Sequence, residues 1–120
     1  MLGYEVISMD IDKEMIKGYI ESIILSLLRN EDLYGYEISK RISDLSKNTF
    51  QIKEGTLYVV LKRLENNKLI TPYWDDTESG GGRRRYYRIT DEGRSYFITK
   101  TTEWEFFKNI LDVFYKGGHI

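Results

Sequence analysis

The sequence predicts a mainly helical fold with one small β-hairpin, and two neighbouring segments support this prediction. Between residues 54 and 67, apolar side chains recur within one arc at about 100° per residue, as they do in an amphipathic helix. That arc consists of Leu57, Val60, Leu61 and Leu64. Two β-prone runs follow, residues 69–74 and 85–90, and the Gly-rich acidic segment between them is typical of a turn. A helix that leads directly into a basic hairpin is the layout of a winged helix-turn-helix.

Two further helices are expected before this unit. Asp12 is a suitable N-cap for a first helix that extends to about Leu28, and Gly18 within it could permit a close helix crossing. A second helix is expected from about Tyr34 to Leu45. The apolar stripe of the first helix consists of Ile16, Ile20, Ile23, Ile24 and Leu27, and that of the second of Ile38, Ile42 and Leu45. Both helices are therefore expected to bury one face in a common core.

The side of the 54–67 helix opposite its apolar arc fits a DNA-reading surface. Thr56 and Arg63 flank one edge of this outer face, and Tyr58 flanks the other. The face itself carries Gly55, Val59, Lys62 and Asn66. A recognition helix places its N-terminal turn in the major groove while basic side chains reach phosphates. An ordinary amphipathic surface helix would show the same pattern, so the helix alone does not decide between the two.

The hairpin favours the DNA-reading interpretation. Pro72 lacks a backbone N–H and so indicates an edge strand. Three glycines at 80–82 followed by Arg83, Arg84 and Arg85 predict a mobile tip with a dense positive patch. Such a patch can lie along a phosphate backbone or enter a minor groove. A solvated charge run is the alternative, but it does not explain why the patch follows a basic helix.

The net charge of −1 is unevenly distributed along the chain. Residues 1–50 carry six Lys/Arg and nine Asp/Glu, a net charge of −3. Residues 51–90 carry eight and five, a net charge of +3, and residues 91–120 carry four and five, a net charge of −1. The excess positive charge is thus confined to the helix and hairpin that we expect to bind DNA.

A last helix is expected to begin near Asp91, because Thr90 can cap it and acidic residues occupy its first turn. Apolar residues then recur with the heptad spacing of a coiled-coil seam. The seam consists of Phe97, Trp104, Phe107, Leu111 and Phe114. Since the preceding helices already close a core, we assign the seam to a partner subunit. An intramolecular cap over the domain is the alternative.

Three motifs in series resemble the PadR transcriptional regulators. They are residues 33–38 (LYGYEI), residues 54–58 (EGTLY) with 61–65 (LKRLE), and residues 81–90 (GGRRRYYRIT) with 92–93 (EG). The resemblance extends from about Ile20 to Gly93 and continues into a single C-terminal helix, as in the short, LmrR-like members. Val59 stands where many members have proline, and the LmrR-like members lack that proline too.

The resemblance implies a cytoplasmic homodimeric repressor that binds an inverted-repeat operator in double-stranded DNA. Residues 1–90 would form the winged helix-turn-helix domain, and residues 91–120 the dimerisation helix. The residues expected to contact DNA are Tyr36, Lys40, Lys53, Thr56, Tyr58, Lys62, Arg63, Arg83, Arg84 and Arg85.

The resemblance also implies a hypothesis about an effector. Trp104 matches a position at which LmrR-like members carry an aromatic residue facing a pore between subunits. A planar hydrophobic molecule would then release the repressor, bound by Ile16, Trp104 and Phe107. A tryptophan used only for packing at a dimer seam is the alternative.

Other functions receive little support from the sequence. It has no cysteine and a single histidine, His119, near its end, so we expect no metal, no cofactor and no catalytic site. The glycine run is not followed by the Gly-Lys-Ser/Thr of a phosphate loop. The longest apolar stretch, residues 23–28, is too short to span a bilayer, and no signal peptide pattern precedes it. Two alternatives remain. One is a winged-helix protein-interaction module without direct DNA binding. The other is an RNA-binding domain, which is disfavoured because the sequence predicts no exposed sheet rich in aromatic residues.

Overall fold

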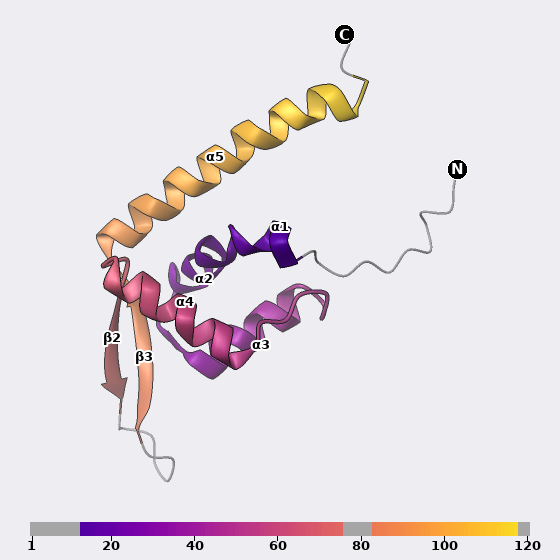
Figure 1. Cartoon of the computed structure of the whole chain (residues 1–120). Helices are drawn as coiled ribbons and strands as arrows, with labels where there is room; N and C mark the ends of the chain where they lie inside the picture. The colour runs from indigo at the N-terminus through magenta and orange to yellow at the C-terminus, as the bar shows by residue number, and fades with distance from the viewer. Residues whose placement is uncertain (1–12, 76–82, 118–120) are drawn as a thin grey trace.

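The structure is a computed structural model that describes residues 13–75 and 83–117. A group of helices lies at its centre, a hairpin extends from one side, and a long last helix runs past the group (Figure 1). The helices are α1 (Lys13–Lys17), α2 (Ile20–Leu28), α3 (Gly35–Leu45), α4 (Glu54–Asn66) and α5 (Asp91–Tyr115). The strands are β1 (Leu33–Tyr34), β2 (Ile70–Asp75) and β3 (Arg84–Ile89). This architecture confirms the prediction of a mainly helical fold with a β-hairpin.

The sheet has three antiparallel strands in the order β1-β3-β2. β2 and β3 form the predicted hairpin, and β2 lies at an edge, as expected from Pro72. β1 differs from the expectation, because Tyr34 lies in a strand opposite Tyr86 and not in a helix. The Glu37 carboxylate accepts a hydrogen bond from the Tyr34 backbone N–H at 3.2 Å. The second helix therefore begins one residue later than predicted, at Gly35.

The prediction of one helix from Asp12 to Leu28 is wrong, since α1 and α2 are separated at Gly18 and Tyr19. Tyr19 has φ −112° and ψ −6°, and its N–H donates to the carbonyl oxygen of Ile16 in a turn tighter than the α-helical one. Glycine disfavours a helix interior by about 1 kcal/mol relative to alanine, which explains the place of the break. A Cβ at Gly18 would meet no atom within 4 Å, so among the described residues this glycine serves no close helix crossing. The N-cap expected at Asp12 lies outside the described residues.

The hydrophobic core lies among α2, α3, α4 and the inner face of the sheet. The whole predicted arc of α4 is buried, as are Ile38 and Ile42 of α3. The inward placement of Leu45 is wrong: it is 72% exposed because α3 ends there and the chain turns through Lys47 and Asn48, both with positive φ. α2 is buried over a wider arc than predicted because it contacts α3, α4, α5 and β3. Its buried residues are Ile20, Ile24, Leu25 and Leu28, with Ile23 and Leu27 half-buried.

α5 is fixed to the rest of the chain at its first turn. The Thr90 hydroxyl accepts a hydrogen bond from the Gly93 N–H at 2.9 Å, which is the predicted N-cap, and it donates to the carbonyl oxygen of Lys68 at 2.8 Å. A Cβ at Gly93 would collide with the Leu69 carbonyl oxygen, so only glycine fits this close approach. Phe97 packs against the core, and residues 101–110 are all exposed. The helix continues past the group of central helices (Figure 1).

Candidate nucleic-acid interface

α4 is held against α3 by a contact between Tyr58 and Gly35. A Cβ at Gly35 would collide with the Tyr58 hydroxyl, so the glycine leaves room for the phenol ring. Gly35 is buried, whereas part of the Tyr58 ring remains exposed. Tyr58 therefore sets the packing of the two helices and also reaches the surface.

The first turn of α4 is open to solvent beside the start of α3. Tyr36 and Tyr58 are both exposed and line a hollow of about 250 Å³ with Glu54. Lys53 and Thr56 are exposed at the same end of α4. Four of the predicted DNA contacts are thus accessible around the start of this helix.

The outer face of α4 is as the sequence predicts. It forms an open hollow of about 580 Å³ that includes the exposed Val59. The remaining lining residues are Gly55, Tyr58, Lys62, Arg63, Asn66 and Asn67. This surface carries polar and basic groups around a small apolar patch, which is suited to contact with base edges and phosphates.

The basic residues of α3 and α4 have acidic neighbours. Lys40 is paired at 2.9 Å with an aspartate one turn further along α3, and this hydrogen bond raises the pKa of Lys40. Lys62 Nζ lies 4.0 Å from Glu65 Oε2, which is the outer limit of an ion pair. Arg63 Nε donates to Glu21 Oε2 at 2.6 Å. Of these three predicted contacts, Lys62 is the least restrained.

The wing is defined as β2, β3 and the residues between them. Its first two described arginines, Arg83 and Arg84, each lie over an aromatic ring. The Arg83 guanidinium is 4.8 Å from the centroid of the Trp74 ring, and that of Arg84 is 4.8 Å from the Tyr34 ring. Arg83 is exposed and Arg84 is half-buried. Stacking on a ring keeps a guanidinium extended without removing its N–H donors, which remain suited to phosphate oxygens.

The third arginine, Arg85, joins the wing to α4. Its Nη2 donates to both carboxylate oxygens of Glu65 at 3.3 Å, and its guanidinium lies 5.8 Å from the Trp74 ring. Its Nε is buried without a hydrogen-bond partner among the described residues. Burial raises the pKa of the neighbouring Tyr87, and the Arg85 charge opposes that rise. Arg85 is therefore bound to α4 and half-buried, in contrast to the exposed Arg83.

An aromatic row crosses the outer face of the sheet. The Tyr86 ring centroid is 5.4 Å from that of Tyr34 and 5.7 Å from that of Tyr73. The sheet is thus more aromatic than the sequence pattern predicts. Arg84 lies over Tyr34, and Arg88 lies over Tyr73 at 5.0 Å, so these rings pack against arginines and leave little open face for unstacked bases.

Three acidic residues organise this surface and were not found from the sequence: Glu21, Asp32 and Glu65. Glu21 binds Arg63 from 42 positions away, Asp32 binds Arg88 from 56, and Glu65 binds Arg85 from 20. No local pattern signals such pairs, because the tertiary fold alone brings the partners together.

Two of the three proposed effector residues lie together. Trp104 and Phe107 line a hollow of about 270 Å³ between the α1–α2 turn and α5, and Trp104 also lines an adjoining hollow of about 240 Å³. The first hollow is completed by Gly18, Tyr19, Ser22, Lys100 and Glu103. Ile16 lines neither hollow.

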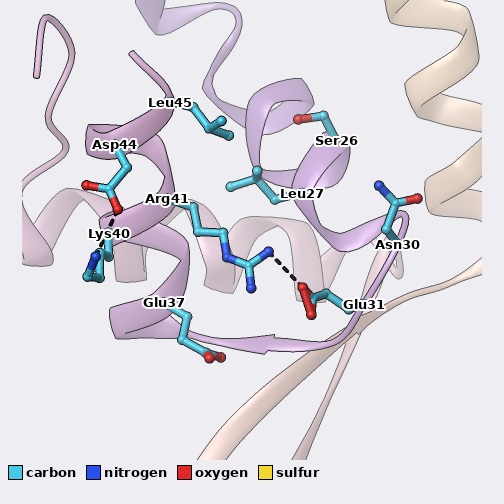
Figure 2. Close-up of a pocket in the computed structure, with 9 residues that line it drawn as sticks. All are labelled: Ser26, Leu27, Asn30, Glu31, Glu37, Lys40, Arg41, Asp44 and Leu45. Atoms are coloured by element: carbon cyan, nitrogen blue, oxygen red, sulfur yellow. Dashed lines mark hydrogen bonds and ion pairs between the residues drawn. The ribbon is translucent and has the colours of Figure 1, made fainter. Parts of the chain in front are cut away.

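A further cleft of about 580 Å³ lies between the end of α2 and α3 (Figure 2). Arg41 Nη1 reaches Glu31 Oε2 across it at 2.7 Å, while Leu27 and Leu45 lie on its apolar side. Lys40 and Asp44 also line the cleft and are paired with each other, and Glu37 completes its charged residues. Two positive and three negative charges leave a net charge of −1, which is little with which to attract an ionic ligand.

The proposed dimer residues fall into two groups. Phe97 packs half-buried against the core of its own domain, with the Arg29 guanidinium 4.7 Å from its ring. The others lie along the distal half of α5 and remain exposed or half-buried: Trp104, Phe107, Leu111 and Phe114. A second exposed stripe runs beside them and was missed, although its helical spacing is visible in the sequence: Phe106, Ile110 and Val113.

Within residues 13–75 and 83–117, no three His, Cys, Asp or Glu side chains are grouped to hold a metal ion. None of the helices described is long and apolar enough to cross a bilayer. His119 lies outside the described ranges.

The model of the PadR-like family of transcriptional regulators matches residues 24–98. A Lysinibacillus sphaericus protein named uncharacterized protein X is 48% identical over 104 residues, which cover 87% of this chain and 94% of that protein. A transcriptional regulator from Clostridium thermocellum has a similar structure, with a TM-score of 0.76 and 46% identity over 82% of this chain and 95% of the other. The Bacillus subtilis PadR protein, solved in complex with operator DNA, shares the fold with a TM-score of 0.62 and 24% identity over 69% of this chain and 45% of that one.

Proposed function

Because the chain belongs to the PadR-like family of transcriptional regulators, we propose that it is a homodimeric repressor that binds double-stranded operator DNA. Its family is one of regulators, so the protein is not an enzyme. The main structural support for the proposal is that the outer face of α4 is exposed and lies beside the arginine-bearing wing. The operator complex of the Bacillus subtilis protein supports the choice of DNA as partner. Such a regulator would act in the cytoplasm.

The proposal divides the interface by role. The open first turn of α4, with Thr56 and Tyr58, would read base edges in the major groove. Lys62, Arg83 and Arg84 would contact phosphates, and Arg85 would hold the wing at the angle that allows this. Tyr36 and Lys53 would contact the backbone beside the start of α4, and Lys40 only after release from its aspartate.

The second copy of the chain would pack on the distal half of α5, within the proposed dimerisation helix at residues 91–120. Two apolar stripes run side by side there, one with Phe107 and Phe114 and the other with Phe106 and Ile110. Together they are wider than a seam for a single helix, so α5 would lie between two elements of the partner. A two-fold dimer predicts an inverted repeat whose half-sites are about 34 Å apart.

The effector would bind in the hollow lined by Trp104 and Phe107. As in the LmrR-like subgroup, a planar hydrophobic molecule would stack on Trp104 between the subunits. It would release the operator only if it binds the free dimer more tightly than the DNA-bound dimer.

A gel-shift assay on the promoter next to the gene, at two salt concentrations, tests the proposal. We expect a complex that competing random DNA does not remove and that weakens as salt rises, because phosphate contacts release counterions. Absence of binding to any promoter fragment would favour the winged-helix protein-interaction module instead.

A further inference from the structure

A single carboxylate connects three helices of the protein. Glu21, on α2, accepts a hydrogen bond from Arg63 Nε of α4 at 2.6 Å through Oε2. Through Oε1 it accepts one from the Tyr96 hydroxyl of α5 at 3.0 Å. The Glu21 side chain is only 18% exposed. A carboxylate that is mostly buried and uses both oxygens is restrained in position, because moving it would leave a charge without partners.

The bond to Glu21 sets the orientation of Arg63. The Arg63 side chain is 50% exposed and lines the outer hollow of α4. Its bond to Glu21 uses Nε, and its two terminal nitrogens make no hydrogen bond to the described residues. Because a guanidinium is planar, fixing Nε fixes the plane in which Nη1 and Nη2 point, and that fork matches the oxygens of a phosphate.

The other end of the connection lies in α5, next to the Trp104 hollow. Lys100 Nζ is 5.3 Å from the centroid of the Tyr96 ring and 3.3 Å from Glu103 Oε1. Lys100 and Glu103 both line that hollow with Trp104. Burial, and next the hydrogen bond to Glu21, raise the pKa of Tyr96, so its hydroxyl stays protonated and remains a donor. Tyr96 therefore links the surroundings of Trp104 to the carboxylate on α2.

We infer that Glu21 is a positioning residue through which α5 controls the contact of Arg63 with the DNA backbone. With Tyr96 on one oxygen, Glu21 holds Arg63 so that its terminal nitrogens face a phosphate. A shift of α5 against α2 moves Tyr96, displaces the carboxylate and turns the guanidinium away. This inference rests on the proposed function, since it requires that the outer face of α4 binds DNA.

The first test is Glu21→Gln, because orientation and simple electrostatics predict opposite results. Removing a negative charge near DNA should strengthen binding if charge alone matters. If Glu21 positions Arg63, binding should weaken, because an amide replaces one of the two acceptor oxygens with an NH₂ group that would face one of the two donors. We expect operator affinity to fall about fivefold. The slope of log affinity against log salt concentration should also fall by about one in magnitude, as for the loss of one phosphate contact. Unchanged or increased affinity would overturn the inference.

The second test is Tyr96→Phe, which removes one hydroxyl from a residue on α5 while leaving the charge of the chain unchanged. We expect it to weaken operator binding about threefold in the wild-type background and to have no effect when Arg63 is alanine. Tyr115→Phe removes the same group from an exposed position at the end of α5 and serves as the matched control, which should bind as wild type. An equal loss with and without Arg63 would mean that Tyr96 acts independently, and the inference would fail.

A third measurement needs no DNA and separates this inference from the proposed function. The Nε–H of Arg63 can be followed by NMR in the free protein, where its bond to Glu21 slows exchange with water. Tyr96→Phe should shift this signal and speed its exchange, whereas Tyr115→Phe should not. If the wild type binds no DNA, the proposed function fails, and this signal still reports the coupling. A signal identical in Tyr96→Phe and wild type would show that α5 does not position Arg63.

Discussion

The helix-turn-helix core and the distal half of α5 contain the same kinds of apolar residue at the same helical spacing, but only the core buries them. Leu64 in α4 is 0% exposed, whereas Phe106 in α5 is 69% exposed. The difference lies in the neighbours: α4 packs against α2, α3 and β2, whereas residues 101–110 of α5 are all exposed, with the α1–α2 turn near only part of this stretch. An amphipathic stripe therefore indicates that a face needs cover, but not which chain supplies it.

The arginines of the wing show the same contrast on a smaller scale. Arg85 is partly buried and bound to Glu65 of α4, whereas Arg83 is exposed although it lies two positions away. Two arginines close together in sequence thus have different roles, because one faces α4 and the other faces solvent. Substitutions at covered and at open positions should therefore have different effects.

The largest effect is expected in the core. Leu64→Ala removes a fully buried side chain and should lower the free energy of unfolding by about 2–5 kcal/mol. Val59→Ala, on the exposed face of the same helix, should change it by less than about 0.5 kcal/mol. Chemical denaturation measures both changes. Equal losses in the free energy of unfolding would contradict the burial of Leu64 and the exposure of Val59.

On the distal half of α5, a charge should break assembly and leave the fold intact. Phe107→Asp places a carboxylate within the apolar stripes and should convert the dimer to a monomer, with operator binding lost. Ile98→Asp carries the same charge at an exposed position before the distal half and should remain dimeric. Sedimentation gives the oligomeric state. A wild-type monomer at micromolar concentration would contradict the proposed interface.

The wing arginines should separate into two behaviours. Arg85→Ala removes the link to Glu65 and should cost about 0.2–1 kcal/mol of stability, since the pair is partly exposed. Arg83→Ala should leave stability unchanged but weaken binding to operator and to random DNA alike. The slope of log affinity against log salt concentration should fall by about one in magnitude. Thermal unfolding and binding titrations at several salt concentrations measure these effects. If Arg83→Ala bound DNA with an unchanged slope, the phosphate role would be wrong.

The smallest structural effect is expected from ligand binding at Trp104. In a Trp74→Phe variant, Trp104 is the remaining tryptophan, and a planar apolar dye should quench its fluorescence to saturation. One ligand per dimer is expected for a site on the two-fold axis. Trp104→Ala should abolish dye binding but keep the dimer and its affinity for DNA. Unchanged emission across a broad panel of such dyes would leave Trp104 as interface packing.

Local features of the fold could be predicted because they depend on residues close in sequence. The buried arc of α4 follows from helical spacing, the edge position of β2 from Pro72, and the start of α5 from Thr90. The inward placement of Leu45 is wrong because helical spacing does not show that α3 ends at this residue, where the chain turns away from the core. The break at Gly18 was missed because glycine only weakens a helix locally, and tertiary packing decides whether it continues.

By itself, the sequence determined the helices and hairpin, the separation of charge along the chain and the motifs that place it among PadR-like regulators. Only the tertiary structure decided that Arg85 binds Glu65 while Arg83 remains exposed. It also decided that Glu21 joins α2, α4 and α5. The physical reason is distance along the chain. Periodicity and caps act over a few residues, whereas Glu21 meets its partners across 42 and 75 positions, where folding alone brings them together.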